Sequence, residues 1–426
     1  LLDENMGDTC PQSIIDALPD YTADEIREAY DELYELKKAG QLFAQDDYID
    51  VSRYIPVNAP VKALCLHVAH DCNLRCQYCF ASTGDFGQGR KIMPPEIAKK
   101  AIDFVIARSG KRRNIEVDFF GGEPLMAWDT VTQTVDYARS LEEKYNKKFR
   151  FTITTNGLLL DEDKRKYINE NMDNCVLSLD GRREVNDEFR KTVAGTGSYD
   201  TIVPKFKALV DERDPNLDYY ARGTFTSHNL DFAEDVLSIA DAGFDRLSVE
   251  PVTADPGCGY DLTEDDLPKI EAEYDRLTDI MLERKKEGKP FTFFHFMVDL
   301  DQGPCVVKRL RGCGAGYEYV AVTPDGDIYP CHQFVGKDEF KQGSVLDQSF
   351  NMDIAQTFAG MNIYSRPKCQ KCWAKFYCSG GCSAANYNMN HDMNDSYDLG
   401  CEMERKRLEC AIYLKAMDKI CANQSK

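Results

Sequence analysis

The chain has 426 residues, a formal net charge of −20 and a hydrophobic content of 43%, which allows two or three domains around a large core. The acidic balance argues against nucleic acid as a partner, because phosphate contacts need a positive face. No apolar run reaches the length of a membrane span and no signal peptide is visible, so we expect a cytoplasmic protein with no membrane partner. The 17 cysteines then indicate metal or cluster ligation, because cytosolic thiols stay reduced.

Residues 1–55 predict a small helical unit, and the opening Leu1-Leu2 suggests that the natural N-terminus lies upstream. Thr22 and Glu25 form a capping-box pattern, and Lys37-Lys38-Ala39-Gly40 ends the helix with positive charge and glycine. The segments Leu42-Phe43 and Tyr48-Ile49 would pair as a short hairpin, which completes the outline of a winged helix. The apolar face of the helix is expected to hold Ile26, Ala29, Tyr30, Leu33 and Leu36.

A winged helix often binds DNA, but this one is acidic where a recognition helix is basic. The unit instead resembles the peptide-recognition element of ribosomal-peptide maturases, which pairs a leader peptide with a sheet edge. A plain packing or oligomerisation module is the alternative.

Beyond Val61 the pattern alternates between strands and amphipathic helices, which predicts an α/β fold with a parallel sheet, a partial (β/α)₆ barrel over residues 56–290. A charged connector helix, Glu264–Glu287, closes this part. The expected strands are Ala63–Val68, Ile115–Phe120, Phe149–Thr154, Cys175–Leu179, Tyr219–Phe225 and Arg246–Glu250. The expected helices are Pro95–Ala107, Thr130–Tyr145, Glu162–Asn169, Tyr199–Val210 and Asp231–Ala242.

Three cysteines, Cys72, Cys76 and Cys79, follow the first strand, and Phe80 comes directly after them. Three thiolates can hold three irons of a [4Fe–4S] cube and leave the fourth iron open for another ligand. Zinc and local disulfides fit less well, since the loop has no histidine and three cysteines cannot all pair. The loop resembles the signature of the radical SAM enzymes, in which the open iron binds S-adenosylmethionine.

The resemblance extends to the ends of later strands, where parallel α/β sheets place their sites. Gly121-Gly122-Glu123-Pro124 is similar to the motif that binds the methionine amino group of the cofactor, and paired glycines also suit close backbone approach. By the same resemblance Asn156 faces the cofactor, Ser178 contacts its ribose, Arg190 binds its carboxylate and Val252 meets its adenine. The alternatives are an Asn-Gly turn at Asn156 and an exposed salt bridge at Arg190.

Residues 291–426 carry a second set of cysteines: Cys313, Cys331, Cys369, Cys372, Cys378, Cys382 and Cys401. Their spacing resembles the pattern of the SPASM subfamily of radical SAM enzymes. The resemblance implies two auxiliary [4Fe–4S] clusters, the first on Cys313, Cys331 and Cys382. Its fourth ligand is either Cys305 or an open position. The second cluster would be held by Cys369, Cys372, Cys378 and Cys401. A zinc ribbon on Cys369, Cys372, Cys378 and Cys382 leaves the other three cysteines without a role.

The remaining cysteines are expected to be core or surface thiols: Cys10, Cys65, Cys175, Cys258, Cys410 and Cys421.

The whole pattern resembles the maturases that build thioether links in ribosomal peptides, the sactipeptide and ranthipeptide class, with the SCIFF-peptide maturases as the nearest group. It implies three [4Fe–4S] clusters, S-adenosylmethionine, a precursor peptide whose leader binds residues 1–55, and a low-potential electron donor such as a flavodoxin or ferredoxin. The expected reaction joins a cysteine sulfur to a carbon of the same peptide. Alternatives are an anaerobic sulfatase-maturing type of oxidation and, less favoured, a redox-sensing DNA-binding regulator.

Overall fold

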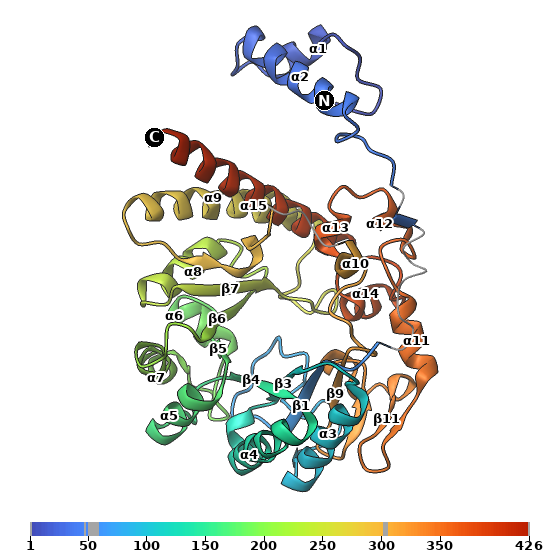
Figure 1. Cartoon of the computed structure of the whole chain (residues 1–426). Coiled ribbons are helices and arrows are strands. Elements are labelled where there is room, and N and C mark those ends of the chain that lie inside the picture. Colours follow the sequence, from blue (N-terminus) through green and yellow to red (C-terminus); the bar gives the residue numbers. More distant parts are fainter. Residues whose placement is uncertain (1, 47, 50–58, 301–305, 425–426) are drawn as a thin grey trace. The chain divides into compact units, whose positions relative to one another are not determined.

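The computed structural model describes residues 2–46, 48–49, 59–300 and 306–424 (Figure 1). The chain forms two compact units, Leu1–Arg53 and Tyr54–Lys426. Each has its own buried apolar cluster, and the small one consists of Met6, Ile14, Ile26 and Tyr30.

The first unit contains a short helix α1 (Gln12–Asp16) and a long helix α2 (Ala23–Lys38). The expected capping box is present, because Thr22 N donates to Glu25 Oε2 at 2.8 Å and Glu25 N donates to Thr22 Oγ1 at 3.3 Å. Ile26 and Tyr30 are buried, whereas Ala29 and Leu36 of the expected apolar face are exposed. The short helix α1 cannot cover every side of α2, so part of the expected apolar face stays exposed.

The expected hairpin is wrong for the described residues: residues 41–46 and 48–49 contain bends and a single helical turn but no strand. Phe43 adopts a φ of 55°, which interrupts extended backbone. Asp46 Oδ1 accepts a hydrogen bond from Tyr48 N at 3.1 Å, so a local turn uses an N–H that strand pairing would need. The winged-helix outline is therefore not formed by this part of the chain.

The second unit is built on one sheet whose described strands follow the order β12-β11-β10-β9-β1-β3-β4-β5-β6-β7-β8, with β2 paired to β1. Strands β1 and β3 to β8 pair in parallel, and the sheet is open at β8 and β12, as a partial barrel requires. All six expected strands are confirmed. The barrel strands are β1 (Ala63–His70), β3 (Asn114–Gly121), β4 (Lys148–Thr155), β5 (Asn174–Ser178), β6 (Asp218–Phe225), β7 (Arg246–Pro251) and β8 (Thr292–Phe293).

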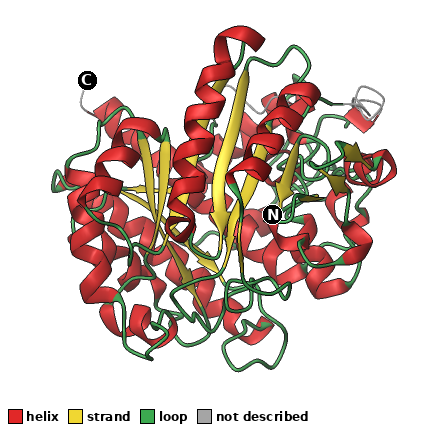
Figure 2. Cartoon of the chain, turned by 90° about the horizontal axis from the view of Figure 1, so that it is seen from below, coloured by secondary structure: helices red, strands yellow, loops and turns green. Residues whose placement is uncertain are grey.

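The helices lie outside the curved strands (Figure 2). The five expected helices and the connector are confirmed. They are α3 (Pro95–Arg108), α4 (Trp128–Tyr145), α5 (Glu162–Asn171), α7 (Tyr199–Asp211), α8 (Phe232–Asp241) and α9 (Leu267–Lys286). The structure adds α6 (Arg183–Phe189) and the short 3₁₀ turns η2 (Pro124–Ala127), η3 (Glu264–Asp266) and η4 (Phe294–Phe296).

The C-terminal part extends the same sheet, because β9 pairs in parallel with β1 from Ala63↔Tyr319 to Leu66↔Val322. Its strands are β9 (Tyr319–Val322), β10 (Asp327–Tyr329), β11 (Gly343–Ser344) and β12 (Ser349–Phe350). The two-residue β2 (Lys91–Ile92) pairs antiparallel with Ala69 and His70 at the end of β1. Its turns are η5 (His332–Phe334) and η6 (Asp338–Phe340). Its helices are α10 (Val306–Arg309), α11 (Met352–Gly360), α12 (Pro367–Gln370), α13 (Lys375–Cys378), α14 (Ser383–Asn390) and α15 (Asp398–Gln424).

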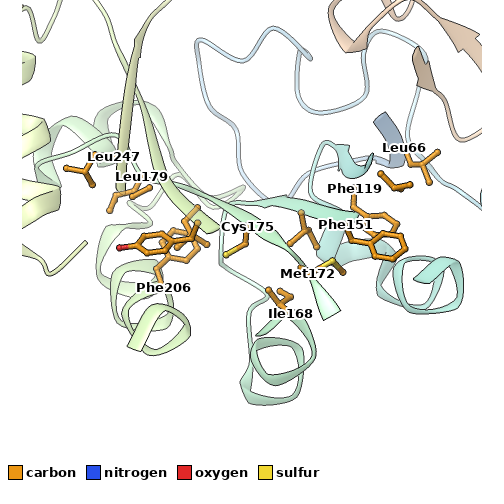
Figure 3. Close-up of a cluster of buried hydrophobic side chains, with 14 of the residues drawn as sticks. Leu66, Phe119, Phe151, Ile168, Met172, Cys175, Leu179, Phe206 and Leu247 are labelled. Carbon is orange, nitrogen blue, oxygen red and sulfur yellow. The ribbon is translucent and has the colours of Figure 1, made fainter. Parts of the chain in front are cut away.

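The main core lies between the parallel strands and their covering helices (Figure 3). Phe119 and Phe151 stack from neighbouring strands with ring centroids 5.8 Å apart. Cys175 is fully buried among these apolar side chains, which confirms its expected role as a core residue. None of the helices in the described part of the chain has an apolar stretch of the kind a bilayer crossing needs.

Candidate functional site

The three cysteines of the first loop face a cavity of about 250 Å³ at the carboxyl ends of the parallel strands. The loop follows β1 and is fixed at both sides. Asp71 Oδ1 accepts from Cys72 N at 2.8 Å, and Arg75 N donates to Lys191 O at 2.7 Å. These two hydrogen bonds hold the loop in place, and Cys72, Cys76 and Cys79 line one wall of the cavity.

Most of the residues predicted to contact the cofactor line the same cavity. They are Phe80, Gly121, Gly122, Asn156, Ser178, Arg190 and Val252. The cavity also contains residues that the sequence analysis did not single out: Arg222, Thr224, Glu250, Thr253, His332 and Gln333. Residues from β3, β4, β5, β6 and β7 and from the turn η5 thus meet at one place.

The paired glycines allow two segments of backbone to approach each other. A Cβ on Gly121, whose φ is +121°, would lie 2.3 Å from Ala69 O. A Cβ on Gly122 would lie 2.1 Å from Asp71 O. Any side chain here would push the end of β3 away from the cysteine loop, so the glycines serve the packing of the site as well as access to a ligand.

Glu123 lies behind the cavity wall instead of in it. Its side chain accepts hydrogen bonds from Thr155 Oγ1 at 2.8 Å, Asn156 N at 2.7 Å and Leu125 N at 3.0 Å. Burial raises the pKa of Glu123 to about 7, and the three hydrogen bonds oppose this shift. Glu123 Oε1 and Oε2 hold the loop after β4, and the contact of Glu123 with a cofactor amino group stays a prediction. Pro124 is buried as the first residue of η2.

Asn156 is held by this carboxylate and reaches back to the cysteine loop. Its Nδ2 donates to Asn73 Oδ1 at 2.8 Å and lies 3.5 Å from Cys72 Sγ. Its Oδ1 accepts from Leu158 N at 3.1 Å, so Asn156 also forms the local turn that was the alternative interpretation. A polar amide is thereby fixed beside the first cysteine.

Arg190 belongs to a buried network of three side chains. Its Nη2 lies 2.9 Å from Asp180 Oδ1, and Tyr78 OH donates to Asp180 Oδ2 at 2.5 Å. Its Nε is buried and has no hydrogen-bond partner among the described residues. Arg190 is thus a buried cation with a spare donor beside the cavity, which suits an acidic ligand group such as a carboxylate.

The thiols of this loop are buried enough to resist ionisation without a positive partner. Burial raises the pKa of Cys72 and of Cys76 to about 12 and also raises that of Cys79. Cluster irons would supply the missing positive charge, because metal ions stabilise bound thiolates. Three thiols, a spare guanidinium donor and a glycine-lined wall fit a [4Fe–4S] cluster with S-adenosylmethionine.

The cysteines predicted for the auxiliary clusters fall into two further cavities. Cys313, Cys331 and Cys382 line one of about 50 Å³. Cys369, Cys372, Cys378 and Cys401 line another of about 210 Å³, and burial raises the pKa of Cys378 to about 12 and of Cys401 to about 11. Within the described ranges, no three His, Cys, Asp or Glu side chains are arranged around a single metal ion.

The possible fourth ligand Cys305 lies outside the described residues. Of the other cysteines, Cys65 and Cys410 are buried, Cys258 and Cys421 are exposed, and Cys10 is half-buried.

A fourth cavity, of about 260 Å³, lies beside these sites. It shares Pro251, Val252 and Thr253 with the first cavity, and it also touches Cys382, Cys378 and Cys401. Residues at and just beyond the carboxyl end of β7 thus line both the first cavity and this one.

Comparison with known proteins agrees with this arrangement. Residues 66–220 match the radical SAM superfamily, and residues 313–373 match the iron–sulfur cluster-binding domain SPASM. A cysteine-type anaerobic sulfatase-maturating enzyme of Clostridium novyi (strain NT) is 25% identical over 350 residues, which make up 78% of this chain and 90% of the relative.

Two solved structures share the fold. The structure of anSMEcpe with bound AdoMet and Cp18Cys peptide has a TM-score of 0.68 at 20% identity, over 86% of this chain and 100% of that one. Streptococcus suis SuiB bound to precursor peptide SuiA has a TM-score of 0.55 at 18% identity, over 88% of this chain and 89% of that one.

Proposed function

Because the chain carries a radical SAM domain and a C-terminal SPASM domain, we propose that this radical SAM enzyme links a cysteine sulfur to a carbon of the same ribosomally made, cysteine-rich peptide. The product is a thioether, as in the sactipeptide and ranthipeptide class, and the SCIFF peptides are the proposed substrate group. The crosslink removes one hydrogen from carbon and one from sulfur. Solved relatives carry a Cp18Cys peptide or a precursor peptide, which supports a peptide substrate.

The observation that carries the thioether proposal is the small cavity lined by Cys313, Cys331 and Cys382. Three described thiols leave one ligand position of a [4Fe–4S] cluster for either Cys305 or a substrate cysteine. His332 and Gln333, which directly follow Cys331, line the main cavity. A substrate sulfur at the first auxiliary cluster would thus be close to a substrate carbon in that cavity.

The cofactors are S-adenosylmethionine and [4Fe–4S] clusters. Cys72, Cys76 and Cys79 would hold the cluster that binds S-adenosylmethionine, and the two auxiliary clusters would use the cysteine sets of the smaller cavities. When bound, the first cluster and S-adenosylmethionine supply a radical that can remove hydrogen from a C–H bond.

The chain's own residues orient the reactants and keep water and other hydrogen donors out of the main cavity. Arg190 offers a spare donor to a carboxylate, and Asn156 and Ser178 offer polar groups on neighbouring strands. Phe80, Phe120 and Val252 supply apolar wall. A wall of this kind limits water at the place where hydrogen is removed.

We further propose that residues 1–55 bind the leader of the precursor peptide, with residues 56–290 as the radical SAM domain and 291–426 as the SPASM domain. The described residues of the first unit present no strand for sheet addition, so this binding would rely on the face of α2. A low-potential flavodoxin or ferredoxin would supply electrons.

Sulfatase maturation is the second candidate, since the sulfatase-maturating enzyme of Clostridium novyi matches 78% of this chain. Such an enzyme oxidises one protein residue and leaves an aldehyde, whereas a thioether synthase consumes a thiol and leaves a crosslink. The two products differ in mass, and only the aldehyde reacts with carbonyl reagents.

The test is anaerobic incubation of the reconstituted full chain with cysteine-rich peptides encoded beside its gene, followed by tandem mass spectrometry. We expect a peptide lighter by two hydrogen atoms with one thiol blocked to alkylation, and no such product with Cys76→Ala. An aldehyde in place of a blocked thiol would favour the second candidate. Cleavage of S-adenosylmethionine without any peptide change would contradict both.

A further inference from the structure

Arg222 and Glu250 form an ion pair in the wall of the main cavity. They come from β6 and β7, whose parallel register joins Arg222 to Ser248 and Thr224 to Glu250. Their side chains are 45% and 35% exposed, and both line the cavity. Neither residue belongs to the set predicted to bind S-adenosylmethionine.

The pair has hydrogen-bonding capacity to spare. Arg222 Nη2 contacts Glu250 Oε2, but Arg222 Nε and Nη1 make no hydrogen bond among the described residues. Glu250 Oε1 likewise makes none and lies 3.9 Å from His295 Nε2. A guanidinium has five N–H donors and a carboxylate about four acceptor positions, so both groups can bind a ligand while they remain paired.

The charges of the pair decide what kind of ligand fits. Arg222 and Glu250 sum to zero, so a charged side chain would be attracted by one and repelled by the other. The backbone of one extended residue is neutral and presents its N–H and its C=O to the same side, where they match the carboxylate and the guanidinium.

We propose that Arg222 and Glu250 bind the backbone N–H and C=O of one extended residue of the substrate, next to the carbon that loses hydrogen. Arg222 donates to the carbonyl oxygen, and Glu250 accepts from the N–H. This role rests on the proposed function. In this arrangement β6 and β7 position the peptide in the main cavity. Most of the residues predicted to face S-adenosylmethionine line this cavity, and so does His332, which follows Cys331.

The test compares truncating and conservative variants of the reconstituted full chain. We expect Arg222→Met and Glu250→Ala to raise KM for the precursor peptide at least tenfold and KM for S-adenosylmethionine less than threefold. Arg222→Lys and Glu250→Gln keep a donor and an acceptor, so each should recover most of the peptide KM. The matched control is Arg246→Gln, which breaks the 2.8 Å pair of Arg246 with Asp218 at the opposite ends of the same strands.

A second measurement separates binding from folding. N-methylation of the substrate amide whose N–H donates to Glu250 should raise the KM of the wild type about tenfold. It should add little to the KM of Glu250→Ala, because this variant has already lost the same hydrogen bond. Peptide KM values that stay within threefold of wild type, or that rise equally in Arg246→Gln, would overturn the assignment and leave the proposed function intact. A wild type that cleaves S-adenosylmethionine but modifies no peptide would contradict both.

Discussion

Gly122 shows how strongly one residue can fix the position of the cysteine loop. Its missing side chain leaves room for Asp71 O, one residue before Cys72. The contact is with backbone, which cannot rotate away as a flexible side chain would.

We predict that Gly122→Ala destabilises the protein by about 1–3 kcal/mol, the usual cost of overpacking, and reduces the iron bound after reconstitution. Iron analysis and the melting temperature measure the two effects. Gly360→Ala is the control, because no atom lies within 4 Å of a Cβ at that position. Equal iron content and melting temperature in both variants would contradict the prediction.

His228, in the loop after β6, joins helix α6 to the loop that contains Gly259. Its Nδ1 lies 2.7 Å from Glu188 Oε1 and its Nε2 lies 2.8 Å from Gly259 O. Both ring nitrogens face acceptors, an arrangement that favours the doubly protonated, cationic ring. The hydrogen bond with Glu188 and then that with Gly259 raise the pKa of His228 above its usual value.

A raised folded-state pKa stabilises the protein fully below the unfolded-state value of about 6.5, and the gain is lost as pH rises through the folded-state pKa. The side chain is 42% exposed, so we expect only about 0.5 kcal/mol. The melting-temperature deficit of His228→Ala should thus shrink between pH 5.5 and pH 9. A deficit that is constant over this range would show that packing alone is lost.

Among elements, the parallel strands and their helices were predictable, because each strand is a short apolar run and each helix has an amphipathic face. The strands β9 to β12 were not predicted, since two to four residues are too few for a recognisable alternation. The long helix α15 was also missed, as charged residues are spread along the segment that carries Cys401.

The candidate site was predictable where a motif has fixed spacing and missed where strand register creates it. The three cysteines lie within the short stretch Cys72–Cys79, and Gly121 and Gly122 are adjacent in sequence. Arg222 and Glu250 are 28 residues apart and meet only because β6 and β7 pair in parallel. Their position at the ends of two expected strands was the available signal.

Helix α2 offers a test of the first unit by itself. Thr22→Ala removes the half of the capping box in which Thr22 Oγ1 accepts from Glu25 N, so we expect it to destabilise the helix by about 1 kcal/mol. Hydrogen exchange of the amides in residues 23–38 should become faster by several fold. Thr9→Ala, an exposed threonine in the same unit that caps no helix, should leave exchange unchanged. Equal exchange in both variants would mean that packing alone sets the stability of α2.

At the scale of the whole molecule, the three cysteine groups predict a definite iron content. Three [4Fe–4S] clusters give about twelve irons per chain after anaerobic reconstitution. Replacing Cys72, Cys76 and Cys79 together with alanine should remove about four, and so should replacing Cys369, Cys372, Cys378 and Cys401. Cys258→Ala is the control, because this exposed thiol lines none of the three cysteine cavities. Tightly bound zinc with little iron would contradict the assignment.

The pairing of β9 with β1 has a consequence for any attempt to divide the protein. A fragment that stops before residue 319 would leave the backbone of Ala63–Leu66 without its neighbour, at the strand that leads into the first cysteine loop. An unpaired strand edge of this kind promotes pairing with other chains and aggregation. The two fragments should therefore precipitate when they are produced separately and stay in solution when they are produced together. The cysteine loop after β1 and the cysteines of the C-terminal part would then belong to one folding unit.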